Sequence, residues 1–237
     1  VGRSAAAQIT TGDNNIALGQ GALGTTTTGD NNIAIGVGAL DSTGNEDTSN
    51  NVAIGRASLT NSTTGGSNTA VGSFTLNANT TGVNNVALGY YSLNDNTTGE
   101  HNIAIGRETL EANTTGSHNI AIGGFNLDAN TTGNYNTSVG RSALGGNTTA
   151  DYNTALGYNT MNANTTGAYN TALGALALDA NTDADSNTAV GYAALTNNTT
   201  AQQNTAVGTN ALSANTTGDL NTAVGYQALT TNTVGDR

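Results

Sequence analysis

The chain repeats itself at a fixed period of seventeen positions, and this period constrains its fold more than any other feature. Variants of N-T-A-V-G recur throughout, and the last glycine of each variant serves as an anchor. The step between anchors is constant, as from Gly72 to Gly89, except between Gly36 and Gly55, so a two-residue insertion is expected near Thr43–Asn50. So short a unit cannot hold a pair of helices and suits one coil of a β-solenoid. The anchors are Gly2, Gly19, Gly36, Gly55, Gly72, Gly89, Gly106, Gly123, Gly140, Gly157, Gly174, Gly191, Gly208 and Gly225.

Residues 1–237 are therefore interpreted as a single array of fourteen coils of an all-β, parallel β-solenoid. The chain opens inside a repeat unit, at Val1 and Gly2, so we expect it to be a segment of a longer array. Each coil is predicted to hold two short strands. One is the N-x-A-φ-G text, in which φ is Val, Ile or Leu, and the other is the text around x-A-L-x-x. Glycine and the N-T-T-G text bend the chain between them.

Only a thin core fits this composition. Hydrophobic residues make up 35% of the chain and aromatic residues 4%, with no Pro, Trp or Cys. A stack of thin coils needs little bulk, because each coil adds an Ala, a Val or Ile, and a Leu to the same columns. The absence of Pro agrees with strands whose N–H groups are all needed for pairing.

An asparagine stands four residues before the anchor in every complete repeat. We expect these residues to form a structural ladder in which each amide bonds the next coil or nearby backbone. A role as ligands is the alternative. The ladder asparagines are Asn15, Asn32, Asn51, Asn68, Asn85, Asn102, Asn119, Asn136, Asn153, Asn170, Asn187, Asn204 and Asn221.

The strand text is apolar or small on both faces. Alternation puts Ala on one face and places φ, with the residue two before it, on the other. That residue is Ile16 in the first complete repeat and Thr from Thr137 onward. A strand buried on both sides needs a partner beyond its own coil. We expect that partner to be a second copy of the chain, in a homo-oligomer.

One column of the repeat, which we expect at the surface, holds histidine and tyrosine side chains. The residue twelve after the anchor is His or Tyr in five successive coils, and stacking on the surface is expected. A metal clamp by the two histidines and carbohydrate stacking on the tyrosines are alternatives. The ring column comprises His101, His118, Tyr135, Tyr152 and Tyr169.

No catalytic set, metal site or cofactor site is predicted, and we expect no enzyme activity. A carbohydrate-active fibre would need paired carboxylates in a groove. We expect the acidic residues to share no fixed offset and interpret them as solubility and edge protection for a chain of net charge −11. The repeated N-T-T text matches the glycosylation sequon but equally suits turn chemistry.

Two partner classes are excluded by composition. The chain has no Lys and its Arg residues are scattered, so no basic stripe exists for nucleic acid. No run of about 18 apolar residues exists, so no membrane insertion is expected in this segment. The scattered arginines are Arg3, Arg56, Arg107, Arg141 and Arg237.

The texts N-N-I-A-I-G-x-x-A-L and N-T-A-V-G-Y-x-A-L resemble the head repeats of trimeric autotransporter adhesins, the YadA-like heads, over all 237 residues. The resemblance implies a left-handed parallel β-roll, a homo-oligomer that is most often a trimer, and an extracellular location at the cell surface. It also implies binding to a host surface, matrix or carbohydrate. The repeat differs in length, with N-T-T-G occupying the extra space. Similar arrays resemble parts of phage tail fibres, which would place the chain in a virion tail fibre.

The expected function is thus a structural and adhesive fibre segment, with a tail-fibre shaft or other surface filament as the alternative. An ice-binding solenoid is a further alternative, since the Asn-rich text resembles some grass antifreeze repeats. Adjacent Thr residues in N-T-T would point opposite ways on a flat strand, which disfavours that function.

Overall fold

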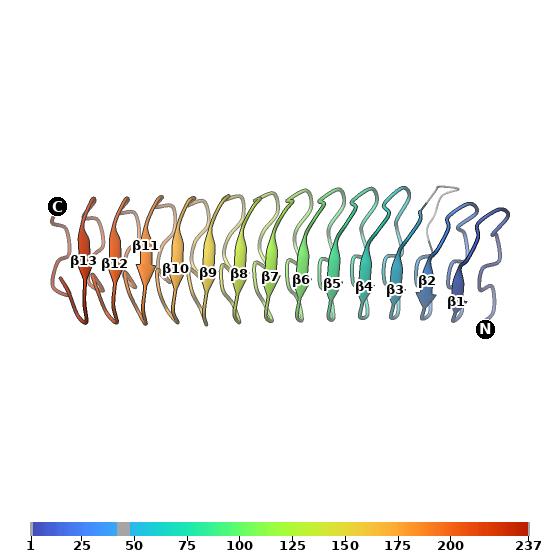
Figure 1. The fold of residues 1–237 in the computed structure, drawn as a ribbon, viewed down its shortest axis with the longest axis horizontal. Coiled ribbons are helices and arrows are strands. Elements are labelled where there is room, and N and C mark those ends of the chain that lie inside the picture. The colour runs from blue at the N-terminus through green and yellow to red at the C-terminus, as the bar shows by residue number, and fades with distance from the viewer. Residues whose placement is uncertain (1, 42–47, 237) are drawn as a thin grey trace. The chain divides into compact units, whose positions relative to one another are not determined.

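The computed structural model describes residues 2–41 and 48–236. The chain forms two compact units, Val1–Asn119 and Ile120–Arg237. The described residues of both are all-β and contain no helix, and each complete coil contributes one three-residue strand to the parallel sheet of its unit (Figure 1). The prediction of an all-β parallel β-solenoid with one repeat unit in each coil is confirmed. Handedness and trimer formation stay predictions.

The strands of each unit follow chain order. Unit 1 contains β1 (Ile16–Leu18), β2 (Ile33–Ile35), β3 (Val52–Ile54), β4 (Thr69–Val71), β5 (Val86–Leu88) and β6 (Ile103–Ile105). Unit 2 contains β7 (Ile120–Ile122), β8 (Thr137–Val139), β9 (Thr154–Leu156), β10 (Thr171–Leu173), β11 (Thr188–Val190), β12 (Thr205–Val207) and β13 (Thr222–Val224). Pairing joins equivalent residues, as in Val86 with Ile103, so every residue type stacks on its own column.

The two-residue insertion leaves the sheet register intact. Ile33 of β2 pairs with Val52 of β3, although the insertion separates them in the sequence. The backbone N–H of Leu40 still donates a hydrogen bond to the carbonyl of Ser58 in the next coil, and the amide nitrogen of Asn32 still donates to the carbonyl of Thr48. The insertion therefore lies between Leu40 and Thr48, of which residues 42–47 are outside the described part of the chain.

The prediction of a second strand in each coil is wrong for the described residues. The x-A-L-x-x text forms turns, because the residues two and four after the anchor have a left-handed backbone. Tyr91 has φ 57° and Leu93 has φ 50°. This conformation costs about 1–2 kcal/mol per residue. At Leu93 the cost is offset by complete burial and by a hydrogen bond from its N–H to the carbonyl of Thr109 at 3.0 Å.

The core lies between the sheet and these turns. Ala87, on the inner face of β5, and Leu93, in the following turn, are both 0% exposed, and equivalent residues repeat this arrangement in neighbouring coils. The anchor glycines allow the coils to stack closely. A Cβ on Gly89, which has φ 133°, would lie 2.2 Å from the carbonyl oxygen of Gly106. Glycine is therefore required at the anchor both by its backbone and by its neighbour.

Candidate functional site

The ladder asparagines are structural hydrogen-bonding groups. The amide oxygen of Asn85 accepts the backbone N–H of Asn102 at 2.9 Å, and its amide nitrogen donates to the carbonyl of Gly99 at 2.9 Å. The same pair of bonds recurs in unit 2, where Asn153 accepts from Asn170 and donates to Gly167, each at 2.9 Å. These amides are buried and bond to the next coil, so they are not placed to bind a ligand.

A second amide column lies in the N-T-T-G turns, seven residues after the anchor. Asn96 donates from its amide nitrogen to the amide oxygen of Asn79 at 2.8 Å and to the carbonyl of Gly99 at 3.0 Å. In unit 2, Asn164 bonds Asn147 in the same way at 3.0 Å. Sequence reasoning missed this inner ladder, which we call the turn asparagines. They are Asn79, Asn96, Asn113, Asn130, Asn147, Asn164, Asn181, Asn198 and Asn215.

Burial of the turn asparagines decides between the two interpretations of the sequon. Each is 0% exposed. A glycan attaches through the amide nitrogen, which in Asn96 is already bonded to the core. The folded turns therefore do not present an acceptor for glycosylation, and the N-T-T text serves the interior of the coil.

The expectation that acidic residues share no offset is wrong. Seven acidic residues of the described part of the chain stand eleven residues after an anchor, and several of them accept a backbone N–H from the preceding coil. Asp30 accepts from the N–H of Asp13 at 2.7 Å, and Asp219 accepts from that of Gln202 at 2.7 Å. A carboxylate is used because it accepts a strong hydrogen bond at an exposed edge. The acid column comprises Asp13, Asp30, Glu100, Asp151, Asp185, Asp219 and Asp236.

The ring column stacks within each unit. In unit 2, Tyr135 and Tyr152 lie 5.0 Å apart with planes 2° from parallel, and Tyr152 and Tyr169 lie 5.2 Å apart. Rings stacked this closely cover one another's faces, so a sugar has no face to pack against except at the ends of the row. The tyrosines therefore present ring edges and hydroxyl groups to solvent.

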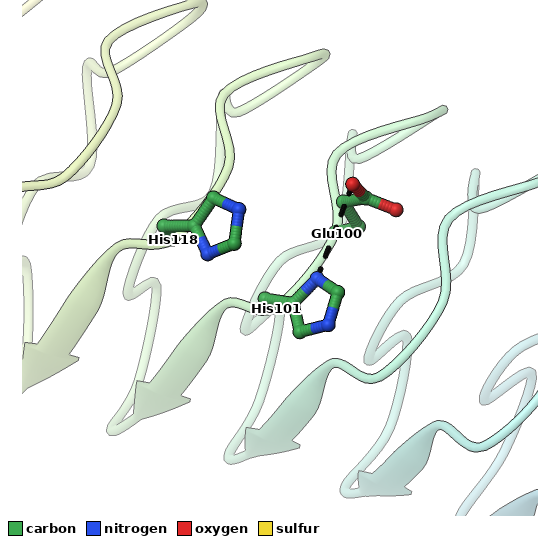
Figure 2. A group of neighbouring side chains, drawn as sticks. All are labelled: Glu100, His101 and His118. Atoms are coloured by element: carbon green, nitrogen blue, oxygen red, sulfur yellow. Dashed lines mark ion pairs between the residues drawn. The ribbon is translucent and has the colours of Figure 1, made fainter.

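In unit 1 the two histidines stack in the same manner, and a carboxylate lies beside them. The rings of His101 and His118 are 4.9 Å apart and 10° from parallel. Glu100 approaches Nδ1 of His101 to 4.0 Å (Figure 2). The ligand atoms of Glu100, His101 and His118 all lie within 4.8 Å of one another, and all three residues are exposed. Within residues 2–41 and 48–236 they form the one cluster of this kind.

The outer face of the sheet carries two partly exposed columns, which we call the outer-face columns. They consist of the first and third residues of every strand. In unit 1, Leu88 and Ile105 are each 37% exposed, and in unit 2 the same is true of Ile122 and Leu173. No charged residue occurs in either column of the described strands. The outer-face columns thus form an uncharged, half-exposed stripe along each unit.

An aromatic cluster in unit 1 occupies positions one and two after the anchor. The ring centroids of Phe74 and Tyr91 lie 5.1 Å apart, and those of Tyr91 and Tyr90 lie 4.5 Å apart. The guanidinium carbon of Arg56 lies 5.2 Å from the centroid of the Phe74 ring. Burial raises the pKa of the Tyr91 hydroxyl, and Tyr90 raises it further. The cluster places flat apolar surface beside a cation and hydroxyl groups, a combination common at binding surfaces.

No known protein family, curated protein or solved structure matches this chain. In the part of the chain that the structure describes, no helix has the length and apolar character needed to cross a bilayer.

Proposed function

We propose that this chain is a structural segment of an extracellular fibre, in which copies of the chain associate through the outer-face columns. The observation that carries this proposal is the in-register, uncharged stripe on the outer face of each unit, typified by Leu88 and Ile105 at 37% exposure. Both columns are apolar in unit 1 except at Thr69, and one column is apolar in unit 2 from β8 to β13. Complete burial of such a side chain contributes about 1.5–3 kcal/mol. About a third of that remains to be gained at apolar positions such as Leu88 and Ile105, whereas the Thr residues of the stripe contribute less.

A second copy of the chain is the occupant that fits the stripe best. The stripe is uncharged although the chain carries a net charge of −11. A partner would therefore contact it through apolar and other uncharged side chains. Its rows repeat at the strand spacing of a parallel sheet, about 4.8 Å. Another copy presents the same rows at the same spacing, so every coil can make the same contact. Such isologous or cyclic contacts are usual in homo-oligomers.

The assembled fibre would act passively. Stacked coils make a stiff spacer, and the aromatic cluster around Phe74 and Tyr91 supplies a surface for a host component, matrix or carbohydrate. The resemblance to adhesin heads favours a trimer at a cell surface, and a tail-fibre shaft would use the same assembly. No catalytic step is part of this proposal.

Sedimentation equilibrium of the folded chain tests the association. We expect an oligomer for the wild type, and dissociation to monomer for the double variant Leu88→Lys and Ile105→Lys, because lysine would be buried without a partner. Thr98→Lys, at an exposed turn position away from the sheet, is the matched control and should leave the mass unchanged. A folded wild-type monomer at high micromolar concentration would refute the proposal.

One observation favours a second candidate, an ice-binding surface. The first outer-face column of unit 2 is Thr in every strand from β8 to β13, and it lies next to a column of Val or Leu. These Thr residues point the same way, unlike the adjacent pair in N-T-T. The measurement is thermal hysteresis. A clear freezing-point gap would support this candidate, and its absence at high protein concentration would dismiss it.

A further inference from the structure

The two histidines of this chain stand next to each other in space although a full repeat unit separates them in the sequence. His101 and His118 are the only histidines in the sequence, and both occupy the ring column on successive coils. Glu100 precedes His101 and points along the same edge (Figure 2). This trio is independent of the outer-face columns, so it bears on a different property from the proposed fibre assembly.

We propose that Glu100, His101 and His118 bind one divalent transition-metal ion, with Zn²⁺ as the reference ion. Two imidazoles and one carboxylate are a ligand set that Zn²⁺ uses, with water completing the coordination. Imidazole also suits Cu²⁺ and Ni²⁺, whereas Mg²⁺ and Ca²⁺ require mostly oxygen ligands. The expected class is therefore a borderline-soft ion rather than a hard one.

The distances allow the ion to be held after small rotations of exposed side chains. Nitrogen and carboxylate ligands lie about 2.0–2.2 Å from Zn²⁺, so two ligand atoms on one ion are at most about 4.4 Å apart, and about 3.4 Å apart in a tetrahedron. The ligand atoms here lie within 4.8 Å of one another before any ion is bound. A closure of roughly 1.4 Å completes the tetrahedral site. All three side chains are exposed, so little packing opposes that movement.

Asn84, in the preceding coil, is placed to orient His101. Its amide nitrogen lies 3.3 Å from Nε2 of His101, while Nδ1 of the same ring faces Glu100 at 4.0 Å. A metal-bound imidazole usually donates its other N–H to a neighbouring oxygen. Rotation of the Asn84 amide would present its oxygen to Nε2–H and leave Nδ1 to ligate the ion. Asn84 is thus a positioning residue for the proposed site.

The test is a Zn²⁺ titration of the full chain without a polyhistidine tag, at neutral pH, by calorimetry and by imidazole NMR. We expect one ion for each chain, with both histidine ring signals shifting together. His118→Asn should weaken binding by more than about tenfold, and Glu100→Gln by about tenfold. Asn is a suitable replacement because it occupies the same column at Asn84, where φ is 58°.

Glu108→Gln is the matched control, since Glu108 pairs with Arg107 outside the site. It should leave the affinity unchanged, and far-UV circular dichroism should show that each variant is folded. No histidine shift at millimolar Zn²⁺ would overturn the proposal. Equal affinity of the wild type, His118→Asn and Glu100→Gln would overturn it as well, because binding would then occur elsewhere on the chain.

Discussion

Ser138 interrupts a column of alanines on the inner face of the sheet, and its hydroxyl is the clearest defect in the core. Ser138 pairs with Ala121 on one side and Ala155 on the other. It is 0% exposed, and its Oγ has no hydrogen-bond partner among the described residues. Burying an unsatisfied hydroxyl costs about 1–3 kcal/mol. We therefore predict that Ser138→Ala stabilises unit 2.

The magnitude follows from the two opposing effects of that substitution. Removing the hydroxyl recovers about 1–3 kcal/mol of desolvation. It leaves a void on the order of 10 Å³, which at about 24 cal/mol per Å³ costs only about 0.2 kcal/mol. No hydrogen bond to a described residue is lost. The net gain is about 0.8–2.8 kcal/mol, and a gain of about 1 kcal/mol corresponds to roughly a fivefold change in an equilibrium constant.

Native-state hydrogen exchange measures this gain locally, which suits a repeat array whose unfolding need not be two-state. The amides of Thr137 and Gly140 flank Ser138 and donate to backbone carbonyls at 2.8 Å. They should exchange about fivefold more slowly in Ser138→Ala. Ala172→Ser, which faces an alanine on either side, is the reciprocal control and should speed exchange of the amides around it by a similar factor. Unchanged or faster exchange in Ser138→Ala would show that the hydroxyl is satisfied and that the reasoning is wrong.

Three further predictions concern the coil. Gly89→Ala should destabilise unit 1 by about 2–4 kcal/mol in urea unfolding, because its Cβ meets a carbonyl oxygen at 2.2 Å. Its control is Gly38→Ala, where φ is 66° and an added Cβ meets nothing within 4 Å, which should cost only the about 1–2 kcal/mol of the left-handed backbone. Asn164→Ala should cost about 3 kcal/mol, because it removes three buried hydrogen bonds, to Asn147, to Gly167 and from Asn181, and takes away the donor to the Asn147 amide oxygen. In a glycosylating host the folded chain should keep its unmodified mass at Asn96, and a glycan found there by mass spectrometry would contradict its burial.

Much of the coil could be predicted from the period alone. A constant period puts like residues in register, so the pairing of Val86 with Ile103 and the stacking of Ala87 on Ala104 follow from the repeat. The anchor glycine could also be identified as essential. How closely the next coil approaches depends on the three-dimensional structure, in which a Cβ added to Gly89 would lie 2.2 Å from the carbonyl oxygen of Gly106.

The second strand was mispredicted for a physical reason. Alternating large and small residues around Leu93 have the same pattern whether the backbone is extended or left-handed, and only the sign of φ separates the two. Leucine rarely adopts a left-handed conformation, so no propensity rule predicts it. Tertiary burial and a hydrogen bond to the next coil favour it here.

The candidate sites were predicted in part. The ring column was visible as a column, because His101 and His118 occupy the same position of successive repeats, but the approach of Glu100 depends on side-chain positions. The buried ladder of turn asparagines could not be predicted, because a glycosylation sequon and a surface turn each explain the N-T-T text without burial. The acid column was overlooked because other residues, such as Ser117, fill the same position in some coils.

Coverage of the outer face by another copy is the central claim, and thiol labelling tests it most directly. The chain contains no Cys, so Ile105→Cys places a single thiol on the stripe at a site that is 37% exposed in one copy, and Thr98→Cys places one on an open turn. The association account predicts that a bulky maleimide labels Ile105→Cys much more slowly than Thr98→Cys at high protein concentration, and that the ratio of the two rates narrows on dilution. A ratio of the two rates that is the same at every protein concentration would show that the face is free and would contradict the account.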